Sequence, residues 1–150
     1  MRAPNILCAL DYVPDNYRIE DIYEYLFEAH PDTRASFVLD ANMSVRGSML
    51  QQCFEIILDY AEGGDLYALT IVGNYHNHDG YGVDPAIFLD FFGAIQAWIS
   101  KICSEMIYGA NREGEGIKGA HAQGLIMENL HAEWEIMISD FNRVLKDATE

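Results

Sequence analysis

The sequence predicts an all-α protein of a single domain. Apolar residues recur at the spacing i, i+3, i+4 and i+7 in most segments, which indicates helices with one buried face. The chain has only 4 prolines in 150 residues, and its one Asp-Gly pair, Asp79-Gly80, does not join two alternating strands. Half of the residues are hydrophobic, so a chain of this length can bury a sizeable core.

The N-terminal half predicts three helices and a short turn. The helix before Pro31 ends at His30-Pro31, because the residue that precedes a proline disfavours helical backbone. The polar residues around Asp40 separate the turn from the third helix, whose wide apolar face predicts packing on two sides. We expect the helices at Ile6 to Tyr12, about Tyr17 to Ala29 and about Met43 to Tyr60, with the turn at Asp32 to Phe37.

The C-terminal half predicts three further helices. Asp65 can cap the first of them, and Asp84-Pro85 offers a cap and a first-turn proline for the second. The segment Gly109 to Gly124 holds five glycines with charges between them, which predicts an exposed, mobile connection. We expect the helices at Leu66 to about His78, Pro85 to about Tyr108, and Leu125 to about Lys146.

Charge and cysteine content exclude several classes of protein. The formal net charge is −15, with 24 acidic and 9 basic residues, so nucleic acids and anionic membranes are poor partners and a basic protein is a better one. Cys8, Cys53 and Cys103 are an odd, widely spaced set, which predicts reduced core thiols and no disulfide framework or zinc site. No signal peptide or membrane span is apparent, so we expect a cytoplasmic protein.

The stretch from Ile71 to Phe88 is the most distinctive part of the chain. Its apolar residues predict a helix that ends near His76 and His78. Glycines follow, and the next predicted helix begins at Pro85. A histidine held just before such a corner suits an iron ligand, because neutral imidazole binds haem iron and a helix fixes its direction. A histidine at a frayed helix end is the alternative interpretation of this stretch alone.

Four motifs in order resemble the globins, specifically the bacterial single-domain and flavohaemoglobin-like branch. The similarity runs from about Tyr17 to Asp90 and resumes weakly near Trp134. Its motifs are Ile22 to Pro31, the phenylalanine that follows that proline (Phe37), Met43 to Leu50, and the proximal signature His78-Asp79-Gly80-Tyr81-Gly82-Val83-Asp84-Pro85-Ala86-Ile87-Phe88. The resemblance implies a globin fold of about six to eight helices around a haem b pocket.

On the proximal side, the resemblance implies that His78 ligates the iron. Its Nδ1–H could donate to the carbonyl of Asn74, one turn back, and so fix the ring plane. Val83 and Phe88 would pack under or beside the haem. His76 is the alternative ligand, because the residues before it also match a family pattern. The number of residues from Leu50 onward matches the family without a gap at His78, which favours His78.

On the distal side, the resemblance implies that Phe37 stacks on the porphyrin and that Tyr23 donates a hydrogen bond to dioxygen in the dry pocket. Leu50 would set the steric limit over the iron. Each of these three could instead be an ordinary core residue. Arg46 stands where the family usually has glutamine or histidine; it could bind an anionic ligand or a haem propionate, and we expect it to turn to solvent when the site is empty.

The resemblance thus implies a protein that reversibly binds dioxygen, nitric oxide and carbon monoxide, more a ligand-binding or oxygen-transport protein than a dedicated enzyme. Phe88 replaces a proximal tyrosine of the flavohaemoglobins, and this departure argues against peroxidase or dioxygenase activity. Nitric oxide dioxygenation would need an external reductase, since the chain has no flavin or nicotinamide domain. Two alternatives stay open: a haem-less, globin-like sensory or interaction module, and an acidic protein that binds a basic partner. The sequence does not indicate an oligomeric state.

Overall fold

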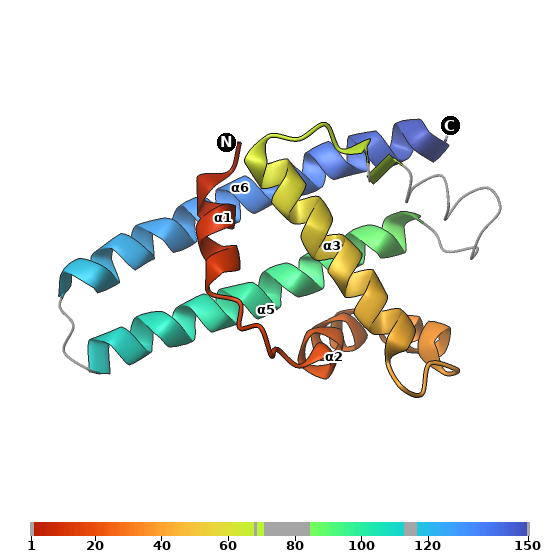
Figure 1. Ribbon diagram of the computed structural model, residues 1–150, viewed down its shortest axis with the longest axis horizontal. Helices are drawn as coiled ribbons and strands as arrows, with labels where there is room; N and C mark the ends of the chain where they lie inside the picture. Colours follow the sequence, from red (N-terminus) through yellow and green to blue (C-terminus); the bar gives the residue numbers. More distant parts are fainter. Residues whose placement is uncertain (1, 68, 71–84, 113–116, 150) are drawn as a thin grey trace.

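The described part of the chain is entirely helical. The computed structural model describes the backbone of residues 2–67, 69–70, 85–112 and 117–149, and within these ranges all side chains except those of residues 36, 85–88, 106–126 and 148–149. No strand occurs in these ranges, which confirms the all-α prediction for them. The elements are α1 (Pro4–Asp11), α2 (Ile19–Ala29), the 3₁₀ helix η1 (Pro31–Phe37), α3 (Ser44–Glu62), α5 (Pro85–Arg112) and α6 (Ile117–Thr149), as labelled in Figure 1.

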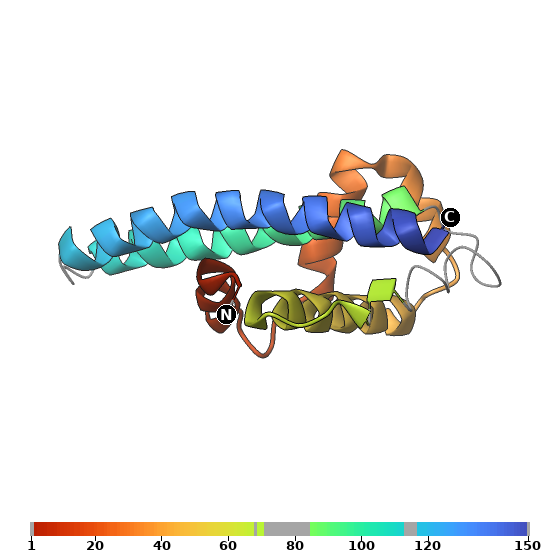
Figure 2. The ribbon, with the colours of Figure 1, turned by 90° about the horizontal axis from the view of Figure 1, so that it is seen from above.

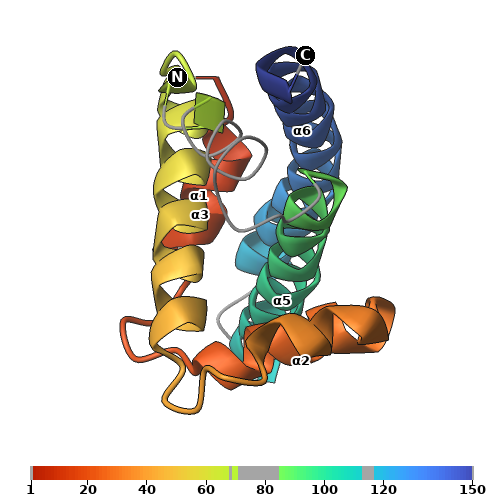
Figure 3. The same ribbon diagram turned by 90° about the vertical axis from the view of Figure 1, so that its right-hand side faces the viewer.

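The helices form two layers, with one helix across their end. The long helices α5 and α6 lie side by side and antiparallel, and α1 and α3 form the second layer against them (Figure 2). Helix α2 runs across one end of this arrangement, where it packs on α5 (Figure 3). The start of α3 therefore lies near α2 and η1, and its last turn lies near the N-terminus, where the Arg2 N–H donates to the Ala61 carbonyl at 2.8 Å.

Local sequence explains where the early helices begin and end. Helix α1 starts with Pro4, which is tolerated in a first turn because that N–H has no partner within the helix. Helix α2 ends at Ala29, directly before the predicted His30-Pro31 break, and Pro31 starts η1. Helix α3 ends at Glu62 and is followed by Gly63, whose φ of 98° is the left-handed conformation that glycine adopts at low cost.

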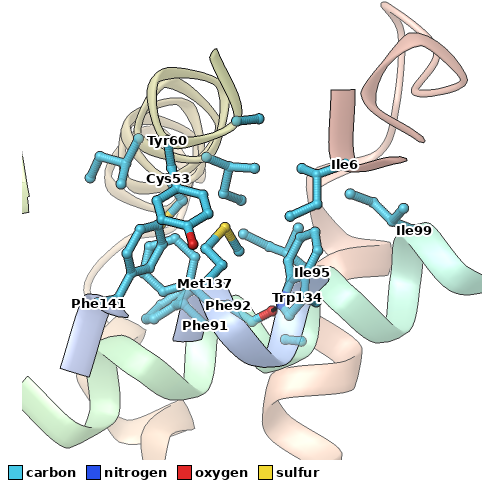
Figure 4. Close-up of a cluster of buried hydrophobic side chains, with 14 of the residues drawn as sticks. Ile6, Cys53, Tyr60, Phe91, Phe92, Ile95, Ile99, Trp134, Met137 and Phe141 are labelled. Atoms are coloured by element: carbon cyan, nitrogen blue, oxygen red, sulfur yellow. Dashed lines mark hydrogen bonds between the residues drawn. The ribbon is translucent and has the colours of Figure 1, made fainter. Parts of the chain in front are cut away.

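The core lies between the two layers. Figure 4 shows buried side chains of α1 and α3 meeting those of α5 and α6, with aromatic rings at the centre. The rings of Phe92 and Phe141 pack edge to face at 4.8 Å between centroids, and Tyr60 packs on Phe141 at 5.4 Å. Full burial of one such apolar side chain contributes about 1.5–3 kcal/mol, so this core is the main source of stability.

Polar groups on core aromatic residues connect different helices. The Trp134 indole N–H of α6 donates to the Phe92 carbonyl of α5 at 3.1 Å, although Trp134 is fully buried. The Tyr60 hydroxyl of α3 donates to a carboxylate oxygen of Asp140 in α6 at 2.7 Å. Burial and the hydrogen bond to Asp140 raise the pKa of Tyr60 to about 12, so this hydroxyl stays a donor at neutral pH.

The predicted glycine-rich connection at Gly109 to Gly124 is wrong in its extent. Helix α5 continues to Arg112 and α6 already begins at Ile117, so at most residues 113–116 connect the two helices. Each glycine weakens a helix by about 1 kcal/mol relative to alanine, but that is a weak preference which helix-forming neighbours and the pairing of two long helices outweigh.

The helix predicted from Leu66 to His78 is described only at its start. Tyr67, Leu69 and Thr70 have helical backbone, and the Tyr67 N–H donates to the Asp65 carboxylate at 3.1 Å, which confirms Asp65 as a cap. The rest of that predicted helix lies outside the described residues. Cys53 and Cys103 are buried free thiols, as expected of core residues, whereas the free thiol Cys8 is only half-buried. None of the described helices has the length and apolarity needed to cross a bilayer.

Candidate functional site

Four of the predicted site residues, from three separate elements, come together at the start of α3. Tyr23 lies on α2, Phe37 ends η1, and Arg46 and Leu50 lie on the first turns of α3. The Tyr23 hydroxyl donates to the Arg46 carbonyl at 3.0 Å, and the rings of Tyr23 and Phe37 pack edge to face with 5.2 Å between centroids. Leu50 is fully buried in the same core. We call these four residues the distal cluster.

The other predicted site residues cannot be located. His78 and Val83, like the alternative ligand His76, lie outside the described residues, and Phe88 belongs to α5 but its side chain is not described. Among the described residues, no group of three or more His, Cys, Asp or Glu side chains could hold a metal ion.

Two phenylalanines extend the distal cluster into a wall of aromatic rings. Phe27 of α2 lies 5.7 Å from Tyr23 between ring centroids, and Phe91 of α5 lies 5.3 Å from Tyr23 and 6.2 Å from Phe37. Both lie at helical spacing from other apolar residues in the sequence, a pattern that indicates a buried helix face and no particular role. Packing α2 across α5 brings them to the same place as Tyr23, so the wall joins α2, η1 and α5.

Asp40 holds the start of α3 and its arginine in place. Its carboxylate accepts the N–H groups of Val45 and Arg46, both at 3.0 Å, and so caps two of the helix's unpaired donors. It also accepts from the Arg46 guanidinium Nε at 3.1 Å, and the same guanidinium donates to the Asp40 carbonyl. The sequence signalled Asp40 only as part of a polar break, so its contact with Arg46 was missed.

The structure corrects the expectation for Arg46. The sequence predicted that this side chain turns to solvent when the site is empty, but it is 17% exposed and paired with Asp40. Burial alone would raise the pKa of the Asp40 carboxyl; the hydrogen bonds from the Arg46 and Val45 N–H groups and from the guanidinium outweigh burial and lower it. The pair is therefore charged on both sides at neutral pH, and Arg46 is held at the edge of the distal cluster.

The Tyr23 hydroxyl is a protected hydrogen-bond donor. Tyr23 is 2% exposed, and burial, followed by the nearby Cys53 thiol, raises its pKa far above that of free tyrosine. Its acceptor, the Arg46 carbonyl, is inside a helix and also takes the N–H four residues later in the regular α-helical pattern. A carbonyl has two lone pairs, so the Tyr23 bond is additional and can be exchanged without leaving the carbonyl unpaired.

The distal cluster therefore brings apolar rings and one hydroxyl donor together in the core. Two cavities lined by described residues lie elsewhere, between α2 and α5, and neither is lined by a member of the distal cluster. Comparison with known proteins adds no identity: no family model, curated protein or solved structure matches this chain.

Proposed function

We propose that this protein is a haem-binding globin that reversibly binds diatomic gases. One observation carries the proposal: residues far apart in the sequence, to which the globin resemblance assigns distal roles, gather in one place on three elements. Had the resemblance been accidental, nothing would require the rings of Tyr23 and Phe37 to pack on each other. The order of a short 3₁₀ helix after α2 and a long antiparallel pair at the end of the chain also suits a globin arrangement of helices.

The chemistry of the distal cluster fits one face of a haem pocket. A porphyrin face is flat and apolar, so rings such as Phe37 and an aliphatic side chain such as Leu50 suit it, and a single donor suffices for a small polar ligand. Haem, held through its iron by His78, would supply the ferrous centre that binds dioxygen, nitric oxide or carbon monoxide. Arg46, fixed by Asp40 at the edge, can meet a propionate or an anionic ligand.

Tyr23 would act by exchanging its acceptor. Without a ligand it donates to the Arg46 carbonyl, and with a polar ligand in the pocket it can turn its hydroxyl to that ligand. The exchange costs little, because the carbonyl keeps its helical partner, and the donor is strong in a site that excludes water. Nitric oxide dioxygenation with an external reductase would be a secondary activity of the same site.

One observation favours a second candidate, a haem-less module with the same fold. The polar groups of Tyr23 and Arg46 already have protein partners, so the distal cluster is complete without a ligand. A protein that senses or binds a partner could use the cluster only to hold α2, η1 and α3 together. The two candidates differ in whether the pocket takes up haem.

The test is the visible absorption spectrum of the protein supplied with haem, in the oxidised, reduced and carbon monoxide-treated forms. We expect a strong Soret band that shifts on reduction and again with carbon monoxide. His78→Ala should abolish these shifts, while His76→Ala, the matched control two residues away, should leave them intact. The opposite result would exchange the two histidines, and a wild-type protein that takes up no haem would refute the globin proposal in favour of the haem-less module.

A further inference from the structure

The outer face of the α2–α5 contact contains a long groove. Two cavities of about 500 and 550 Å³ lie there, and both are lined by Tyr25 and Glu28, so they meet at these two residues. We propose that this groove binds a basic amphipathic helix of a partner protein. The groove excludes the distal cluster, so the inference is independent of haem.

In one half of the groove apolar residues predominate, beside the contact between His30 Nε2 and Asp90 Oδ1 at 3.4 Å. Leu26 of α2 and Leu89, Gly93, Ala94 and Ala97 of α5 line this half. A Cβ atom added to Gly93 would meet nothing within 4 Å, so the backbone of α5 is open to a neighbour here. Small residues in a row allow the ridges of a second helix to approach closely, which suits the apolar face of an amphipathic helix.

The other half carries unneutralised negative charge. Asp21, Glu24 and Glu28 follow one another on α2 at i, i+3 and i+7, so they form one stripe, and no ion-pair partner of these three occurs in the described part of the chain. Like charges at this spacing repel one another. The two cations at the cavity are already engaged: Arg18 pairs with Glu20 at 3.4 Å and Lys101 with Glu105 at 4.0 Å. Lysines or arginines of a partner would relieve the repulsion.

Aromatic rings line the same acidic half. Tyr17, Tyr25 and Trp98 border the cavity, and Tyr17 packs edge to face on Trp98 at 5.6 Å between centroids. A lysine or arginine can lay its aliphatic stem on such rings and keep its cationic head near the carboxylates. The apolar half of the groove thus complements the apolar face of a basic amphipathic helix. The acidic half, which lies next to it, complements the cationic face.

The length of the groove and the net charge of the protein both favour a basic helix as the partner that binds there. From Leu89 to Glu105 the lined face of α5 extends about 24 Å at 1.5 Å per residue, which matches about four turns of a docked helix. A second copy of this chain is disfavoured, because each copy carries a formal net charge of −15 and the groove is itself acidic. A basic helix has the complementary charge.

The test uses fluorescence anisotropy with a labelled synthetic helix of about 18 residues, built from leucine and lysine with the lysines on one face. We expect the wild-type protein to bind it. Glu24→Lys combined with Glu28→Lys should weaken binding by about tenfold or more. Glu55→Lys combined with Glu135→Lys, at exposed positions on α3 and α6 outside the groove, changes the net charge equally and should change affinity by less than about twofold.

Gly93→Leu tests the apolar half separately. The added side chain enters open space on an exposed helix position, so the protein should stay folded by circular dichroism while peptide affinity falls about tenfold. Three results would overturn the proposal: no binding by the wild type, equal loss in the two charge-reversed double variants, or equal binding of a peptide with the same composition and a scrambled, non-amphipathic order. The last two would indicate attraction by overall charge alone.

Discussion

Tyr23→Phe isolates the contribution of one hydroxyl group. The variant keeps the ring that packs on Phe37 and Phe91, and it loses only the 3.0 Å hydrogen bond to the Arg46 carbonyl. Because that carbonyl keeps its partner within α3, the free energy of unfolding of the haem-free protein should fall by the net value of one hydrogen bond, about 0.5–1.5 kcal/mol. Urea unfolding followed by circular dichroism measures this loss.

Tyr23→Phe also measures how strongly the Tyr23 hydroxyl stabilises bound dioxygen. A hydrogen bond to a partly charged acceptor contributes about 1.5–3 kcal/mol, and Tyr23 gives up about 1 kcal/mol when it leaves the Arg46 carbonyl. The net gain of about 0.5–2 kcal/mol predicts that dioxygen dissociates about 2- to 30-fold faster from haem-loaded Tyr23→Phe than from the wild type. Stopped-flow replacement of dioxygen by carbon monoxide measures this rate.

Two comparisons make the result specific to Tyr23. Carbon monoxide is a weak acceptor, so its own dissociation rate should change much less than that of dioxygen. Tyr60→Phe removes the hydroxyl of another buried tyrosine, which is bonded to Asp140, and it should leave the dioxygen rate unchanged. An unchanged dioxygen rate in Tyr23→Phe would mean that the hydroxyl stays on Arg46 and never serves a ligand, and the distal role of Tyr23 would be refuted.

Four further changes test the fold. Trp134→Phe removes a buried indole and its N–H donor, so urea unfolding should show a loss of about 1–3 kcal/mol. Gly63→Ala places a side chain at φ 98° and should cost about 1–2 kcal/mol in the same assay. The folded state raises the pKa of Tyr60, so wild-type stability should fall as pH rises from 10.0 to about 12, and the fall should be smaller in Tyr60→Phe. The folded state lowers the pKa of Asp40, so stability should fall as pH drops below its ordinary value of 3.8, and Asp40→Asn should show less of that fall.

Much of the helical framework follows from the sequence because its signals are local. The end of α2 at Ala29 depends on a proline two residues later, and the start of α5 at Pro85 depends on a residue that fits only a first turn. Tyr23 and Leu50 also lie at helical spacing from other apolar residues of their segments, and both are buried. That Tyr23 and Phe37 would lie in one wall came from the family resemblance and not from spacing.

The remaining features depend on contacts between distant segments, which a pattern in one segment does not contain. The Asp40–Arg46 pair needs the turn after η1 to fold back on α3, and an aspartate in a polar stretch looks the same whether or not it does so. The extent of α5 and α6 depends on their pairing, which outweighs the weak local effect of glycines near Gly109. His78 and Val83, to which the resemblance assigns proximal roles, lie outside the described residues.

The polar atoms on core aromatic residues have a consequence for the uniqueness of the fold. Hydrophobic contact has no direction, so helices held by it alone could slide past one another by a turn at little cost. Tyr23 links α2 to α3, Tyr60 links α3 to α6, and Trp134 links α6 to α5, each through one directed hydrogen bond. A slip of any pair would leave a buried donor unpaired, at about 1–3 kcal/mol. These three bonds therefore select one alignment of four helices among many that would bury similar apolar area.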